Sequence, residues 1–316
     1  MGRRFADFWL RFFFLWATYA PWVPRVTKPF WMATAWFFSP YLRSVTRSNA
    51  RLILGPDHSE SECRRLAKQT IADFYDFVCD IARCRRRKPE RIRRDVEEIV
   101  GEEGYAQARA SRRGAVLITA HFGSFETGIA ALREREPRLY IVLQRDERAL
   151  FERMRSELHR NLGVEEALVG DGLRMWLRLR EALNKDEVVL IQGDRMIPGQ
   201  KGHLVSMLYG HIQIPLGPIK LAIACDAPMI PVYAIRQPNG RIHIDLDPPI
   251  DPAGRPMEET AERLARSIEK RVAAHPSQWH VLQPMFAENA DPSAPGGMSG
   301  APRTDDEPTP LGRAVM

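Results

Sequence analysis

The alternation of strand-like and helical segments between residues 115 and 246 constrains the fold of this 316-residue chain more than any other feature. Five apolar runs have the length of β-strands: 115–119, 139–143, 188–191, 229–235 and 242–246. Helical patterns lie between the first four runs, at about 126–135, 147–161, 172–185 and 217–224. Because parallel strands need such crossover connections, this alternation predicts an α/β fold with a mainly parallel central sheet flanked by helices.

Local signals mark the limits of this pattern. Ser59 and Glu62 have the spacing of a capping box, so we expect a helix with an apolar stripe to begin there. The sequence Pro238-Asn239-Gly240 joins the last two runs, which predicts an antiparallel hairpin at the sheet edge. A final helix is expected at about 258–274. From residue 287 the chain is rich in Pro, Gly, Ser and Asp, which predicts a disordered tail over 287–316.

The first 42 residues are strongly aromatic, since they hold 15 of the 28 Phe, Trp and Tyr residues. Their two uncharged stretches, 12–24 and 29–42, are shorter than the about 20 residues that a membrane-spanning helix needs. Short aromatic stretches with basic flanks are typical of helices that lie in the membrane interface. We therefore expect residues 1–42 to form a helical membrane-interface segment. A buried helical hairpin, a signal peptide and a single tilted span remain alternatives.

The charge of the chain favours an acidic partner. The formal net charge is +6, and residues 83–94 hold eight Lys or Arg residues. That run is either a solvated helix end or a contact for lipid phosphates or an acidic carrier protein. Nucleic acid is not expected, because the aromatic residues lie apart from the basic run. The cysteines form no CxxC pair and the histidines no HExxH motif, so no metal site is expected.

A histidine stands directly after the first buried run. His121 follows residues 114–120, and ligands of open α/β sheets bind beyond the carboxyl ends of the strands. Gly123 lets the backbone approach a substrate closely, and Glu126 falls in the first turn of the next expected helix. Glu126 could fold back and orient the His121 imidazole as a general base. Spacing alone leaves a purely structural His–Glu pair open as the alternative.

The segment Thr119-Ala120-His121-Phe122-Gly123-Ser124-Phe125-Glu126 resembles the HxxxxD/E block of the lysophospholipid acyltransferase superfamily. The likeness is strongest to the branch of bacterial lipid A biosynthesis lauroyl/myristoyl acyltransferases, which includes phosphatidylinositol mannoside acyltransferases. Residues 140–145, 189–195 and 227–232 resemble the second, third and fourth blocks, in the same order. With residues 49–82 and Gln278-Trp279-His280, the resemblance covers about residues 5–286.

The resemblance implies a glycerolipid acyltransferase-like fold, with the acyltransferase domain over residues 43–286. It implies that His121 is the general base and that Glu126 is its orienting partner. Arg145 would contact a phosphate group of the donor or the acceptor. A surface salt bridge between Arg145 and Asp146 or Glu147 is the alternative.

The third block supplies two further candidates, Asp194 and Arg195. They would line the site, either holding substrate or fixing the catalytic pair; in the alternative, Asp194 caps a turn and pairs with Arg195. Either the Arg195 guanidinium or backbone N–H groups around Gly123 would stabilise the oxyanion. Ser124 is a rival nucleophile, but it lacks the GxSxG elbow.

The implied reaction moves a fatty acyl chain from acyl-carrier protein or acyl-CoA to a hydroxyl of a membrane glycolipid or phospholipid, without cofactor or metal. The implied location is the cytoplasmic face of the cell inner membrane, with peripheral attachment to an anionic surface. Gly193-Asp194-Arg195 stands where lipid A enzymes usually have Asp-Gln-Asp, which leaves the acceptor unspecified. A lipid or thioester hydrolase using the same His–Glu pair and a non-enzymatic membrane lipid carrier are the alternative functions.

Overall fold

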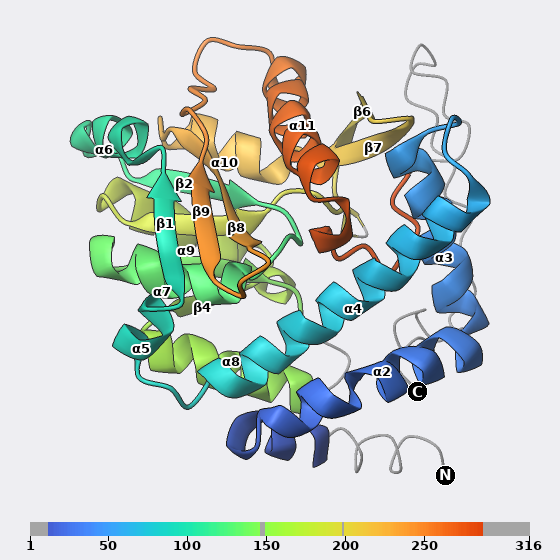
Figure 1. Ribbon diagram of the computed structural model, residues 1–316. Helices are drawn as coiled ribbons and strands as arrows, with labels where there is room; N and C mark the ends of the chain where they lie inside the picture. The colour runs from blue at the N-terminus through green and yellow to red at the C-terminus, as the bar shows by residue number, and fades with distance from the viewer. Residues whose placement is uncertain (1–11, 146–148, 198, 287–316) are drawn as a thin grey trace.

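The computed structural model describes residues 12–145, 149–197 and 199–286, and Figure 1 shows their arrangement. A seven-stranded sheet forms the centre, with the strand order β1-β9-β8-β2-β5-β3-β4. The neighbouring strands are parallel, except for the antiparallel pair β8–β9. The predicted α/β fold with a mainly parallel sheet is therefore confirmed. The strands are β1 (Val96–Val100), β2 (Ala115–Thr119), β3 (Leu139–Leu143), β4 (Glu165–Leu168), β5 (Val188–Gln192), β8 (Met229–Arg236) and β9 (Ile242–Leu246).

Helices occupy each of the patterns expected between the strands and after them. They are α7 (Phe125–Arg135), α8 (Ala149–Leu162), α9 (Leu173–Asn184), α10 (Gly217–Ala224) and α11 (Met257–Ala274). Two short helices, α5 (Pro89–Arg93) and α6 (Glu102–Ala110), flank β1, and two 3-10 turns, η1 (Val169–Asp171) and η2 (Pro276–Gln278), follow β4 and α11.

The hairpin prediction was right about the pairing of the last two strands and wrong about the sheet edge. β9 pairs antiparallel with β8, but β1 lies outside it and pairs with it in parallel, with Val100 opposite Asp245. β1 was not expected because only Val96 of its side chains is fully buried, so its apolar signal is weak. β4 and a separate antiparallel hairpin of β6 (Gly202–Met207) and β7 (Gly210–Pro215) were missed as well.

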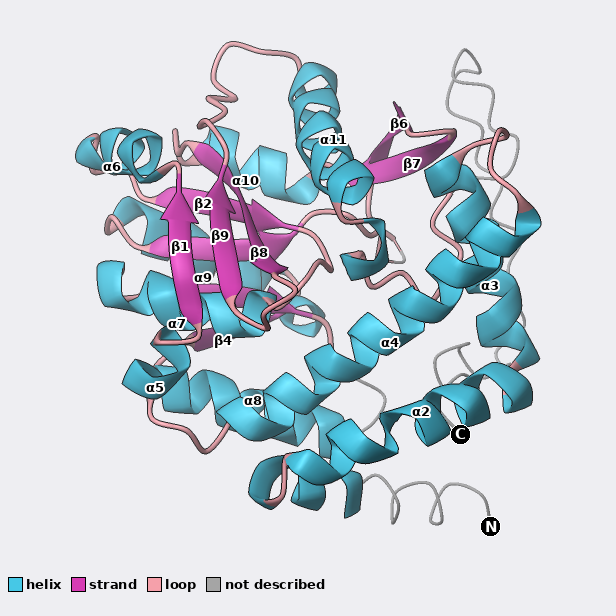
Figure 2. Cartoon of the chain, viewed as in Figure 1, coloured by secondary structure: helices cyan, strands magenta, loops and turns pink. Residues whose placement is uncertain are grey.

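Both faces of the sheet are covered, because successive side chains of a strand point to opposite faces. In β2, Val116 and Ile118 belong to the core under α9, α10 and α11. Ala115 and Leu117 belong to the core under α7 and α8. Figure 2 shows these helices around the magenta sheet. The covered faces leave the carboxyl ends of the strands as the place where polar groups can gather.

The N-terminal part is helical and packs on the long helix α4 (Glu60–Cys84). The predicted capping box is present at its start, because the Ser59 hydroxyl accepts from the Glu62 N–H and the Glu62 carboxylate accepts from the Ser59 N–H. Residues 12–19, α2 (Trp22–Phe38) and α3 (Pro40–Leu54) precede α4, and α2 runs beside it (Figure 1). Within the described ranges, every helix is too short or too polar to cross a membrane. The predicted tail over 287–316 lies outside these ranges.

Candidate active site

The carboxyl ends of β2 and β5 bring the first and third blocks together. The two strands are parallel neighbours with Thr119 opposite Gln192, and the Gly193 N–H donates to the Thr119 carbonyl at 2.8 Å. His121 and Asp194 follow two residues after this matched pair. The register of two buried strands therefore places a histidine beside a carboxylate that lies 73 residues away in sequence.

Asp194 is the hydrogen-bond partner of the His121 ring. Its Oδ1 lies 2.8 Å from His121 Nδ1, and its Oδ2 accepts from the His121 backbone N–H at 3.1 Å. The indole N–H of Trp279 donates to the same Oδ2 at 2.9 Å. The Asp194 side chain is fully buried, whereas the His121 side chain is 28% exposed. A rigid carboxylate thus holds one ring nitrogen while the ring still reaches solvent.

The charges around this pair favour an ionised aspartate and a neutral histidine. Burial would raise the pKa of Asp194, but the attraction of His121 and its hydrogen bond outweigh burial and lower that pKa. Burial and the nearby Arg195 guanidinium lower the pKa of His121. A neutral His121 that donates from Nδ1 to Asp194 carries its lone pair on Nε2. The ring is therefore prepared to accept a proton at Nε2.

Glu126 has a different partner from the one expected. It lies in the first turn of α7 as predicted, but its Oε2 is 2.7 Å from Nε2 of His159, in α8. The other ring nitrogen of His159 is 2.6 Å from Oε1 of Glu166, in β4. Because Asp194 occupies Nδ1 of His121, the prediction that Glu126 orients His121 directly is corrected. Glu126 belongs to a buried ion pair beside the site.

The loop after His121 is held by backbone contacts on both sides. Gly123 has φ +58, and a Cβ there would lie 2.0 Å from the Ala234 carbonyl oxygen. The Gly123 N–H donates to the Gln278 carbonyl at 2.8 Å, and its own carbonyl accepts from Nε2 of His280 at 2.9 Å. Close approach does require glycine at this position. The atoms that approach it are those of β8 and the 278–280 segment.

Ser124 is part of a structural cluster. Its hydroxyl is buried and lies 2.7 Å from a guanidinium nitrogen of Arg236 and 3.3 Å from Asp80. Arg236 also pairs with Asp80. The hydroxyl is buried between a guanidinium and a carboxylate that already pair with each other, so the geometry gives no support to the rival reading of Ser124 as a nucleophile.

Two arginines, Arg195 and Arg155, place positive charge near His121. Arg195 donates to the His280 carbonyl, and its buried Nε has no hydrogen-bond partner among the described residues. Arg155, in α8, donates to the Gln144 carbonyl at 3.2 Å, and both guanidinium groups lower the pKa of His121. Arg145 is exposed just beyond the end of β3, and its suggested partners, Asp146 and Glu147, lie outside the described ranges.

Much of the basic run 83–94 is paired within the protein. Arg83 and Arg87 contact Asp95, Arg85 lies 2.6 Å from Glu157, and Arg93 lies 3.0 Å from Glu134. These pairs join the end of α4 to neighbouring elements, so these four arginines of the run are engaged within the protein and do not form a purely solvated helix end. Its use as a contact for lipid phosphates or an acidic carrier stays a prediction.

Three residues of this region were not singled out from the sequence: Trp279, His159 and Arg155. Trp279 lay in a segment that resembled the family, but nothing in the sequence indicated that its indole would bind Asp194. His159 and Arg155 belong to no recognisable motif, since one histidine and one arginine in an amphipathic helix are usually surface groups. The available signal was weak: their spacing of four residues places them on one helix face.

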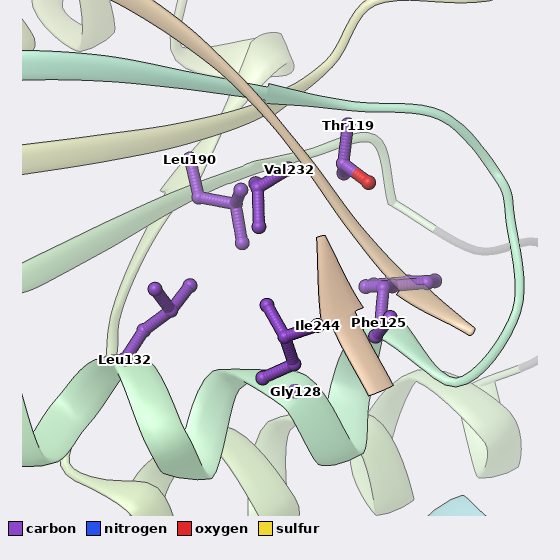
Figure 3. Close-up of a pocket in the computed structure, with 8 residues that line it drawn as sticks. Thr119, Phe125, Gly128, Leu132, Leu190, Val232 and Ile244 are labelled. Atoms are coloured by element: carbon purple, nitrogen blue, oxygen red, sulfur yellow. The ribbon is translucent and has the colours of Figure 1, made fainter. Parts of the chain in front are cut away.

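The void drawn in Figure 3 lies between α7 and the sheet and is separate from this cluster. Phe125, Gly128 and Leu132 of α7 face Val232 and Ile244 of the sheet across it. Its volume of about 10 Å³ holds one water molecule at most. It is therefore a packing gap. Within the described residues, no group of three or more His, Cys, Asp or Glu side chains has the arrangement of a metal site.

The chain is similar in sequence to known proteins. A family model described as bacterial lipid A biosynthesis acyltransferase matches residues 2–288. Phosphatidylinositol mannoside acyltransferase of Mycobacterium tuberculosis is 26% identical over 199 residues, which are 62% of each chain. The protein of the same name from Mycolicibacterium smegmatis is 27% identical over 179 residues, 55% of this chain and 57% of its own. The match thus spans less than two thirds of these relatives.

Proposed function

Because the chain belongs to the bacterial lipid A biosynthesis acyltransferase family, we propose that it transfers a fatty acyl chain from an acyl thioester to a lipid hydroxyl. The observation that carries the proposal is the buried Asp194 carboxylate on Nδ1 of the partly exposed His121. Acyl transfer from a thioester needs a base for the acceptor hydroxyl and no protein nucleophile, because the thioester is already activated. The pair provides such a base, and no metal or cofactor enters the scheme.

The proposed reaction has two steps. The acceptor hydroxyl gives its proton to Nε2 of His121 while its oxygen attacks the thioester carbonyl, which forms a tetrahedral oxyanion. Collapse of the oxyanion forms the ester and breaks the carbon–sulfur bond, and the leaving thiolate takes the proton from His121. Asp194 keeps the ring in the required tautomer and stabilises the imidazolium between the two steps.

The hydrogen bonds of the loop favour Arg195 as the group that stabilises the oxyanion. The N–H groups of Phe122, Gly123 and Ser124 already donate to the Ala120, Gln278 and Ala234 carbonyls. Backbone N–H groups in this loop are therefore engaged. Arg195 is half-buried, and among the described residues its terminal nitrogen atoms have one hydrogen-bond partner, the His280 carbonyl, so the end of its guanidinium has further N–H groups to offer.

The outer side of α2 supports the proposed attachment to a membrane surface. Trp22, Val26, Phe30 and Phe37 recur at helical spacing and are between 65 and 72% exposed. A hollow of about 240 Å³ lies between α2 and α4, where the Lys68 ammonium is 5.2 Å from the centre of the Trp36 ring. An exposed apolar helix face with a lysine nearby suits an anionic bilayer surface. We place it on the cytoplasmic face of the inner membrane, where carrier-protein and CoA thioesters are available.

Flotation with phosphatidylglycerol vesicles tests this attachment. Changing Phe30 and Phe37 to Ser together should lower the fraction that floats with the vesicles, because the two rings would no longer enter the interface. Leu173 and Leu177 of α9 are 73 and 54% exposed, and changing both to Ser is the matched control. Equal flotation of the α2 variant and the wild type would contradict the proposal.

The names of the relatives favour a glycolipid acceptor. We take phosphatidylinositol mannoside as the first acceptor to test because the relatives carry that name. An assay with acyl-CoA or acyl-carrier protein should form acylated lipid with the wild type, and His121→Ala should lose this product while remaining folded by circular dichroism. Product formation at a near-normal rate by His121→Ala would exclude the mechanism. Free fatty acid formed with equal rate without acceptor would indicate a hydrolase instead.

A further inference from the structure

We propose that the buried His159 is a positioning residue for acyl transfer, because it fastens the start of α7, and with it the His121 loop, to α8. The inference rests on the proposed function, in which His121 is the general base, and it gives Glu126 an indirect role. Glu126 would act through His159 on the position of His121, without contacting the reacting atoms.

Hydrogen bonds join three elements at this point. The His159 ring lies between two carboxylates, with Nε2 at 2.7 Å from Glu126 of α7 and Nδ1 at 2.6 Å from Glu166 of β4. The hydroxyl of Ser156, one turn earlier in α8, donates to the second oxygen of Glu166 at 3.0 Å. The side chains of His159 and Glu126 are each 1% exposed. The contact is therefore enclosed, and its geometry is set by the packing of α7 against α8.

The short contacts on both nitrogens indicate an imidazolium, since a neutral ring can donate from only one nitrogen. Burial opposes this charge, but the attraction of Glu126 and the hydrogen bonds with Glu126 and Glu166 outweigh burial and raise the pKa of His159 to about 9. An enclosed ion pair with good geometry holds its partners in one arrangement, because separating them leaves an uncompensated buried charge.

The link from this pair to the reacting group is short. Glu126 lies five residues after His121, in the first turn of α7, so anchoring Glu126 limits the movement of the loop between them. Arg155 lies four residues before His159 on the same face of α8. Its guanidinium reaches the Gln144 carbonyl at the end of β3, and its charge acts on His121. The contact between Glu126 and His159 thus limits the movement of both the loop after His121 and the α8 turn that carries Arg155.

The contacts of Glu126 do not support a direct partnership with His121. Nδ1 of His121 is occupied by Asp194. The second carboxylate oxygen of Glu126, Oε1, is buried and has no hydrogen-bond partner among the described residues. If Glu126 acted directly, its importance for turnover would not depend on His159.

A double-mutant cycle separates the two roles. We expect Glu126→Gln and His159→Gln each to lower kcat, per folded enzyme, by up to about 100-fold, the order reported for a displacement of reacting groups by 1 Å. The double variant should recover most of kcat, because the two amides can hydrogen-bond to each other, and one of them to Glu166, without leaving an unpaired charge at the buried positions 126 and 159. A direct role of Glu126 predicts a double variant as slow as Glu126→Gln, which would overturn the proposal.

Two further measurements complete the test. His243 also lies between two glutamates, 3.3 Å from Glu97 and 3.4 Å from Glu98, in β9 beside the edge strand β1. His243→Gln is therefore the matched control and should keep its kcat. The rate at which diethyl pyrocarbonate modifies His121, followed by peptide mass spectrometry, should change in both single variants and return in the double variant. This readout does not require turnover, so it decides the positioning role even if the wild type transfers no acyl chain. Unchanged modification rates in the single variants would contradict the proposal.

Discussion

At the scale of single residues, the properties of His121 depend on Asp194 and on the charges around the pair. The aspartate alone would make the imidazole a stronger base, whereas burial and Arg195 lower the pKa of His121. The result is a ring that is neutral and correctly oriented at neutral pH. Such a group can accept a proton in the transition state without first having to lose one.

Replacing Asp194 by Asn should lower kcat by about 100- to 10,000-fold, because the amide does not select the tautomer with the lone pair on Nε2 and cannot stabilise the imidazolium. The measurement is the rate of acylated lipid formation at saturating donor. Asp226→Asn is the control, since Asp226 is an exposed residue that pairs with Arg113. A variant of Asp194 that retains a third of the wild-type rate would contradict the role given to this carboxylate.

The pH dependence of kcat/KM should report the lowered pKa of His121. The base is active only when it is neutral, so activity should rise with pH through an acid limb whose midpoint lies below 6.5, the ordinary value for histidine. The limb is read from initial rates between pH 4.5 and 8, a range chosen to bracket that midpoint. An acid limb with its midpoint above 6.5 would show that the effect of Asp194 on the pKa of His121 outweighs the effects of burial and Arg195.

At the scale of elements, α7, α8 and β4 are joined by charged side chains as well as by apolar contacts. The sequence predicted α7 and α8 closely, because their apolar residues recur at helical spacing. It gave no indication of the contact between Glu126 and His159, which lie 33 residues apart. Contacts of this kind depend on how two helices pack, and local periodicity does not encode the packing.

Because of the His159 contact, the free energy of unfolding should decrease as the pH becomes alkaline. The pKa of His159 is raised from 6.5 to about 9 in the folded state, so the stabilisation is fully present below pH 6.5 and is lost as pH rises through 9. The contribution is on the order of 3 kcal/mol. Urea unfolding of the wild type should show this decline, whereas His159→Gln should lack it and His243→Gln should retain it. Parallel curves for the wild type and His159→Gln would contradict the assignment.

At the scale of the whole molecule, the segment after η2 connects the carboxyl ends of the central strands with the N-terminal helices. Trp279 reaches Asp194, and the Asn49 side chain in α3 donates to the carbonyl groups of Val281 and Gln283 at 3.2 and 2.8 Å. The last described residues are therefore attached both to the Asp194 carboxylate and to the N-terminal helices. Asn49 thus supports the segment that carries Trp279.

Replacing Asn49 by Ala should lower the free energy of unfolding by roughly 2–3 kcal/mol, because the buried Val281 carbonyl and the part-buried Gln283 carbonyl would lose their donor. The shift is measured as the urea midpoint at constant slope. Asn184→Ala, at the exposed end of α9, is the control and should be close to neutral. An equal effect of the two substitutions would mean that the 281–283 segment is held by other contacts.

The amino-acid sequence was enough to predict the α/β class, the helices and strands with a strong apolar pattern, and the placement of His121 at a strand end. These features are local, because a strand or helix with a buried face has apolar residues that recur with the period of that element. The position of β1 outside β9 became clear only in the tertiary structure. An edge strand buries few side chains, so its apolar pattern in the sequence is weak. The tertiary structure also shows that Asp194, and not Glu126, holds the His121 ring. Strand register and helix packing create such pairs between distant residues, and the spacing of residues along the chain does not record them.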